Sequence, residues 1–224
     1  MFRHNPIRAF ITGPLARALV RVAVRRSPDV VIGGSEAPYL LRWWVIPRNR
    51  FFNIYLHRFL RSDDDRALHD HPWLNCSVLL RGEYSEHTIA AGGINRRTLR
   101  RAGDVKLRGP KAAHRIELHA GPCWTLFITG PNVRSWGFHC PRGWVHWRDF
   151  TNPADGGRTV GRGCGEDDGA KIPKWQQGPR PSAFGDVWDG MSPRERRSAF
   201  TSDLIIGFGG ALLFGLAAYW FGGA

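Results

Sequence analysis

The sequence predicts an all-β domain of the barrel or sandwich class, with one helix before it and another near the C-terminal end of the chain. Short apolar and aromatic runs, separated by turn-forming Gly, Pro, Asn and Asp, fill residues 38–150. An amphipathic segment precedes them, and an uncharged apolar segment follows much later. The 224 residues include 10 Trp and 13 Phe, enough chain and enough aromatic surface for a buried core.

The β-rich region contains apolar runs of strand length with turn signals between them. These runs are 39–46, 51–60, 76–87, 96–107, 114–120, 123–130 and 135–140. No internal repeat interrupts them. We therefore expect one domain over 38–150, preceded by a helix and lead-in over 1–37.

Residues 151–203 are rich in Gly, Pro and charge, and we expect a linker with a short juxtamembrane segment. Residues 204–221 then run without a charge, close to the roughly 20 residues that cross a bilayer core. Arg194, Arg196 and Arg197 precede this span and no basic residue follows it. The expectation is a single-pass protein of the inner (cytoplasmic) membrane, with its main domain in the cytoplasm.

Small residues recur at every fourth position of the predicted transmembrane helix, at Gly207, Ala211 and Gly215. Such a stripe lets two helices approach closely, so a homodimer is one expectation. Glycine is common in membrane helices in any case.

The predicted N-terminal helix begins near Thr12 and ends before Pro28. Arg17, Arg21 and Arg25 fall on one side of it, next to an apolar stripe. Two interpretations stay open: a helix that packs on the domain with solvated arginines, and a helix that lies on a membrane surface.

Basic residues outnumber acidic ones by 32 to 19, which favours contact with polyanions. The densest basic cluster, Arg96, Arg97, Arg100 and Arg101, lies on one predicted hairpin. No nucleic-acid-binding fold accompanies it, and a membrane segment in the same chain makes anionic lipid the simpler partner. We do not expect a nucleic-acid partner.

The four cysteines are widely spaced and form no CxxC pair, which fits a reducing compartment best. Residue types that can bind zinc occur at His139, Cys140, His146 and Cys164, but their spacing matches no standard zinc finger. We favour a structural role for this segment, in which its aromatic residues close one end of the barrel. Those residues are Trp136, Phe138, Trp144 and Trp147.

His69 and His71 are the first candidates for metal ligands. Side chains alternate along a strand, so the two imidazoles point the same way, and Asn75 follows on the same face. Asp70, between them, should face outward as a solvated or hydrogen-bonding residue. His114, at the start of a later strand, is the best further ligand, with Ile116 on its face and Glu117 and His119 on the other.

This pattern resembles the two motifs of the cupin superfamily. In the first motif an HxH is followed after four residues by Glu and after seven more by Gly; His69, His71, Asn75 and Gly82 occupy these positions. In the second motif a Gly precedes the ligand His by eleven residues, as Gly103 precedes His114. The chain is most similar in character to small uncharacterised cupin-like proteins of phages and prophages.

The resemblance implies a double-stranded β-helix, that is, a jelly-roll barrel, and a divalent metal held by His69, His71 and His114. Asn75 stands where the cupin Glu ligand is expected and is a possible fourth ligand or neighbour. Gly109 and Lys111 replace the motif Pro and Gly, and Asp63 replaces a first-motif Gly. Fe, Mn, Ni and Zn are the candidate ions; imidazole suits most of them, so the identity of the metal stays open.

Tyr84 and Glu86 are the candidate catalytic acid or base, with Arg81 and Arg108 as candidate partners for a substrate carboxylate or phosphate. If the protein is an enzyme, the resemblance implies oxygenation of a small molecule, by a dioxygenase. Two other hypotheses remain. One is a non-catalytic module that binds a small ligand or a protein. The other is a metal-independent sugar isomerase-like protein, with a histidine as base and Tyr84 as acid.

Overall fold

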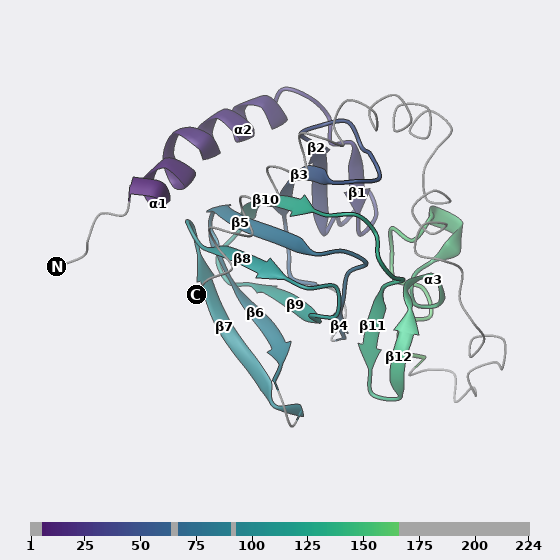
Figure 1. Cartoon of the computed structure of the whole chain (residues 1–224). Coiled ribbons are helices and arrows are strands. Elements are labelled where there is room, and N and C mark those ends of the chain that lie inside the picture. Colours follow the sequence, from purple (N-terminus) through teal and green to yellow (C-terminus); the bar gives the residue numbers. More distant parts are fainter. Residues whose placement is uncertain (1–5, 64–66, 91–92, 166–224) are drawn as a thin grey trace.

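A computed structural model describes residues 6–63, 67–90 and 93–165, and these ranges contain two six-stranded antiparallel sheets (Figure 1). The first sheet has the order β1 (Val30–Ile32), β2 (Leu40–Trp44), β3 (Asn53–Phe59), β10 (Cys123–Thr129), β5 (Asn75–Arg81) and β8 (Val105–Arg108). The second has the order β12 (Gly143–His146), β11 (Gly137–Cys140), β4 (Leu68–His69), β9 (His114–Leu118), β6 (Glu83–Ile89) and β7 (Asn95–Arg101).

From β3 to β10 the chain passes back and forth between the two sheets. The neighbour order is β3-β10-β5-β8 in one sheet and β4-β9-β6-β7 in the other. This is the topology of a jelly roll, so the predicted all-β double-stranded β-helix is confirmed. The predicted runs overlap β2, β3 and β5 to β11. The runs miss β1, β4 and β12, which have two to four residues each.

The interior between the sheets is filled from both sides by alternate residues of the strands. Its apolar cluster consists of Leu40, Phe59, Leu79, Tyr84, Ile116 and Cys123. Gly82 joins β5 to β6 with φ at 85°, and a Cβ there would lie 2.7 Å from the Cys123 sulfur. Only glycine suits both the backbone angle and the space, which explains the motif glycine in physical terms.

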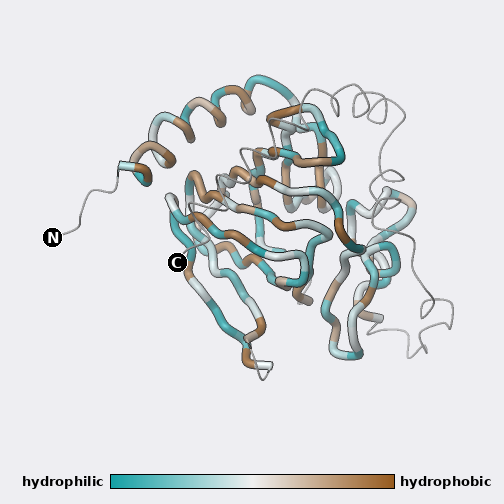
Figure 2. Tube along the Cα trace, viewed as in Figure 1, coloured by the Kyte–Doolittle hydropathy of each residue, from teal (hydrophilic) through white to brown (hydrophobic). Residues whose placement is uncertain are grey.

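The N-terminal helix consists of α1 (Pro6–Phe10), a π-helical turn η1 (Ile11–Leu15) and α2 (Ala16–Ala23). It therefore begins before the predicted Thr12. It lies over the outer face of the first sheet, where Ile11, Ala16 and Ala23 are buried (Figure 1). Apolar and polar residues alternate along it, as Figure 2 shows. Arg17, Arg21 and Arg25 are exposed, so the interpretation that the helix packs on the domain is confirmed.

One end of the barrel is covered by the β11–β12 hairpin, α3 (Trp147–Phe150) and the short 3-10 helix η3 (Pro153–Asp155). Phe138 and Phe150 stack at 3.6 Å between ring centroids, and Trp136 stacks on Trp147 at 5.8 Å. The predicted aromatic closure is confirmed by these contacts.

Cys140 and Cys164 form a disulfide. The expectation that the cysteines suit a reducing compartment is not met by this pair, and the spacing could not show it because no local motif joins the two. Cys76 and Cys123 are free thiols. The zinc site considered for this segment is wrong, because its two thiolates are consumed by the disulfide and His146 caps α3 instead.

Residues 151–165, which we expected to begin a linker, are folded on the barrel. Thr151 pairs with Val160 as an isolated bridge, and the Gly33 amide donates to the Arg158 carbonyl at 2.8 Å. The folded part thus continues beyond Phe150. Within the described ranges no helix is long and apolar enough to cross a membrane, and the predicted span 204–221 lies outside those ranges.

Removing the Cys140–Cys164 disulfide is expected to destabilise this end of the domain. Serine at both positions should lower the free energy of unfolding by about 3 kcal/mol, because the bond closes a loop across 24 residues. Urea denaturation of the double variant and of wild type measures the difference. A Cys76→Ser variant is the control, since that thiol is free. Equal stability of the double variant and the control would contradict the expectation.

Most of the basic hairpin is paired with carboxylates. Arg97 reaches Glu117 at 3.2 Å, Arg100 reaches Glu86 at 2.9 Å and Arg101 reaches Glu83 at 3.6 Å. The cluster is therefore less cationic than its sequence suggests.

Candidate metal centre

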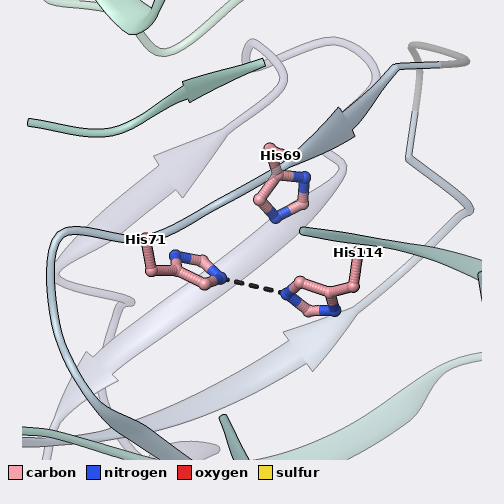
Figure 3. Close-up of side chains that lie close together, drawn as sticks. All are labelled: His69, His71 and His114. Carbon is pink, nitrogen blue, oxygen red and sulfur yellow. Dashed lines mark hydrogen bonds between the residues drawn. The ribbon is translucent and has the colours of Figure 1, made fainter. Parts of the chain in front are cut away.

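Three histidines from two separate segments meet between the two sheets (Figure 3). His69 ends β4 and is paired directly with His114 at the start of β9. His71 follows two residues after His69. The donor nitrogens of all three lie within 4.8 Å of one another. The Nε2 atoms of His71 and His114 are 3.0 Å apart and point toward each other.

Asp70 fixes the backbone from which the first two histidines project. Its carboxylate accepts hydrogen bonds from the Gly137 amide at 2.9 Å and the Trp144 indole at 3.0 Å, and it pairs with Arg134 at 3.0 Å. We expected Asp70 to face outward; it does leave the histidine face, but it is buried, because the β11–β12 hairpin covers it. Its hydrogen-bonding role is confirmed.

Glu86 lies behind His114. Its Oε1 lies 3.4 Å from His114 Nδ1, on the side of the ring away from His71. Arg108 donates to the same carboxylate at 2.6 Å, and Arg100 donates at 2.9 Å. A carboxylate behind one ring nitrogen favours a proton there and leaves the other nitrogen free to bind a metal.

The protonation states of these groups suit a metal site. Burial lowers the pKa of His114 to about 4, and it lowers the pKa of His71 well below its usual value and that of His69 as well. Burial alone would raise the pKa of Glu86, but His114 and Arg108 outweigh it and hold that pKa well below the usual range. Three imidazoles are thus neutral near pH 7, the form that binds metals.

The donor set fits a divalent transition ion. Two imidazole nitrogens that bind one ion at about 2.0–2.1 Å each lie no more than about 4.2 Å apart. The His71–His114 distance of 3.0 Å agrees with this. Imidazole nitrogens suit Zn, Fe, Ni and Cu, and three protein ligands leave positions open.

Asn75 lies at the start of β5, opposite Arg108 and Thr129 on the neighbouring strands. It is fully buried, and both polar atoms of its amide are without a hydrogen-bond partner among the described residues. Buried polar groups are nearly always paired, so a bound ion or water would satisfy this amide. That Asn75 is the fourth ligand of the metal ion, or lies beside its ligands, stays a prediction.

A cavity of about 480 Å³ opens beside the histidines and is lined by all three of them. Tyr84 and Arg108 also line it, whereas Glu86 and Arg81 do not. Burial raises the pKa of the Tyr84 hydroxyl, so that group is a proton donor at neutral pH. Arg108 pairs with Glu86, and Arg81 is exposed at the end of β5.

Arg42 and His57 line the same cavity from β2 and β3, and the sequence interpretation missed both. The available signal was the alternation of β3, in which Tyr55, His57 and Phe59 share a face and the two aromatic residues are buried. A lone histidine in an apolar strand gave no reason to prefer a site over a core position.

Acidification is expected to destabilise the metal-free protein. Burial, and then the charge of Arg42, lower the pKa of His57 well below 6.5, so the unfolded chain takes up a proton before the folded one does. The contribution of neutral His57 to the free energy of unfolding is fully present above about pH 6.5, and it is lost as the pH falls below that value. Urea denaturation of wild type and His57→Gln between pH 7 and pH 5 measures this. Equal pH slopes in the two proteins would contradict it.

No protein-family model matches the chain, and no curated protein matches it in sequence. Solved structures with similar folds include Fe(II)-HppE with an alternative substrate, at 14% identity and a TM-score of 0.37, over 46% of this chain and 58% of that one. An uncharacterised protein with a double-stranded β-helix domain from Klebsiella pneumoniae has 19% sequence identity and a TM-score of 0.38. The match covers 50% of this chain and 94% of that one. Oxalate decarboxylase of Lactobacillus farciminis has 18% sequence identity and a TM-score of 0.37. The match covers 47% of this chain and 32% of that one.

Proposed function

We propose that this chain is a cupin-like metalloprotein that binds one divalent transition ion through His69, His71 and His114. The observation that carries the proposal is the convergence of three neutral imidazole nitrogens beside a cavity, with the Glu86 carboxylate behind His114. The Glu86 carboxylate also pairs with Arg108 and Arg100, and its position behind His114 is the one from which a carboxylate in metal sites sets the orientation and proton position of a ligand.

The catalytic form of the proposal is oxygenation of a small molecule, by a dioxygenase. The ion would supply Lewis-acid and redox chemistry at its open positions. The chain's own residues would bind and orient the substrate in the cavity, and the buried Tyr84 hydroxyl would donate a hydrogen bond or a proton to it. Glu86 would hold the His114 proton at Nδ1 throughout.

Elemental analysis of the full chain, purified without chelators and separately reconstituted with Fe(II), Mn(II), Ni(II) and Zn(II), tests the metal-binding proposal. We expect one equivalent of one or more of these ions after gel filtration. Less than a tenth of an equivalent with every ion would overturn the proposal and favour a metal-independent binding module. Oxygen uptake by the Fe(II) form in the presence of a small-molecule panel then tests the catalytic part.

We also propose, from the sequence alone, that residues 204–221 anchor the protein in the inner membrane. Carbonate extraction of membranes from expressing cells tests this for the full chain. We expect the protein in the membrane pellet, and we expect the double variant Leu212→Arg, Leu213→Arg in the supernatant, because two charges at the centre of the span oppose insertion. Wild type in the supernatant would refute the anchor.

A further inference from the structure

We propose that Arg42 forms a subsite for the carboxylate of a small molecule whose other end reaches the three histidines. The inference rests on the proposed metal function and adds a substrate class to it: a short organic acid with a metal-binding group at the far end. It is carried by the position, the orientation and the unneutralised charge of one arginine.

Arg42 is held in place before any ligand arrives. It is paired with His57 across β2 and β3, and its side chain lines the cavity. Its Nε donates to His57 Nε2 at 2.9 Å, and its Cζ lies 4.9 Å from the centre of the Tyr55 ring. One nitrogen and one face of the guanidinium are thus fixed, which orients the two terminal nitrogens as a fork for planar oxyanions.

The charge of Arg42 has no carboxylate partner among the described residues. Arg108 and Arg134, which line the same cavity, are paired with Glu86 and Asp70. The partner of Arg42 is instead His57, a buried imidazole that accepts its hydrogen bond and is neutral near pH 7. A half-buried cation beside a neutral acceptor leaves a positive charge on the cavity wall, and such a charge favours an anionic ligand.

The arginine and the histidine cluster are neighbours in one cavity. The Phe127 ring lies between them, 5.2 Å from the His57 ring and 5.7 Å from the His71 ring. The cavity of about 480 Å³ is near the small end of ligand sites. A ligand that reaches both ends would therefore be short, with an apolar middle against Phe127.

Two matched hydroxamates test this on the full chain reconstituted with Co(II), whose visible spectrum reports binding. Succinic monohydroxamate and butyrohydroxamate share the metal-binding group, and only the first carries a carboxylate. We expect the first to bind wild type about tenfold or more tighter, because a charge-assisted hydrogen-bond pair forms only with it. This preference should disappear in Arg42→Met and persist in Arg17→Met, an exposed arginine of α2.

Equal affinity of wild type for the two hydroxamates would overturn the subsite and leave the metal site intact. This comparison needs no variant, so a misfolded Arg42→Met protein does not remove the test. If no metal binds, the proposed function has failed, and the subsite is tested alone by phenylglyoxal modification read by mass spectrometry. Protection of Arg42 by butyrate but not by butyramide would support the subsite, and no protection would refute it.

Discussion

Replacing His114 with alanine is expected to reduce the affinity for the divalent ion by about 100-fold or more. The change removes one of three imidazole ligands, and even the loss of a group that only supports a ligand typically costs 10- to 100-fold. Competition with a chromophoric chelator measures the dissociation constant. The same loss is expected for His71→Ala, since its Nε2 lies 3.0 Å from that of His114.

His87 provides the matched control for this experiment. It lies on β6, beside β9, but it faces outward and pairs with Glu117 at 2.8 Å. His87→Ala should therefore keep wild-type metal affinity. If His114→Ala and His87→Ala bind metal equally well, the histidine cluster is a structural one and the proposed site is wrong.

Replacing Glu86 with glutamine should produce the largest loss of stability among the changes considered. Glu86 is fully buried and is the carboxylate partner of Arg108 among the described residues. The substitution leaves the Arg108 cation buried and without its counter-charge, which typically costs about 3–5 kcal/mol. Urea denaturation of the metal-free proteins at pH 7 measures the difference.

Glu117→Gln is the control for Glu86→Gln, because Glu117 forms its ion pair with Arg97 on the outer face of the same sheet. Exposed pairs of this kind contribute less than about 1 kcal/mol. In variants that stay folded, Glu86→Gln should also weaken metal binding about 10- to 100-fold, since the His114 proton loses its acceptor. A stable Glu86→Gln protein with unchanged metal affinity would show that the carboxylate does not support the site.

The jelly roll could be predicted from the sequence because its strands are long enough to alternate. In β3 and β10, seven residues each, buried aromatic and apolar residues mark the inner and outer faces. The three-residue strand β1 carries no such pattern. The disulfide joins Cys140 to Cys164 through tertiary proximity, which no local spacing encodes.

The histidine cluster was predictable for a different reason: its ligands follow fixed spacings along two short segments. His69 and His71 share a face by alternation, and the pairing of His69 with His114 follows from the jelly-roll order of β4 and β9. The role of Glu86 behind His114 depends on the register of β6 with β9, where Glu86 stands opposite Ile116. Register between strands is set by long-range contacts, so the sequence placed Glu86 nearby and could not assign its role.

Arg42 illustrates what sequence reasoning leaves out. An arginine among Leu and Trp in a strand is usually a surface residue whose charge reaches solvent. Here β2 pairs with β3 in a register that sets Arg42 against His57 and turns both into the cavity. Only the assembled sheets show that no carboxylate of the described residues neutralises it.

The measurement that tests the metal centre most directly is X-ray absorption spectroscopy of the full chain reconstituted with a divalent ion. We expect about three imidazole nitrogens at about 2.0–2.1 Å, with oxygen donors in the remaining positions and no sulfur. We expect the imidazole count to fall by one in His114→Ala. A spectrum with at most one imidazole, or with sulfur ligands from Cys76 or Cys123, would contradict the convergence of the three histidines on one ion.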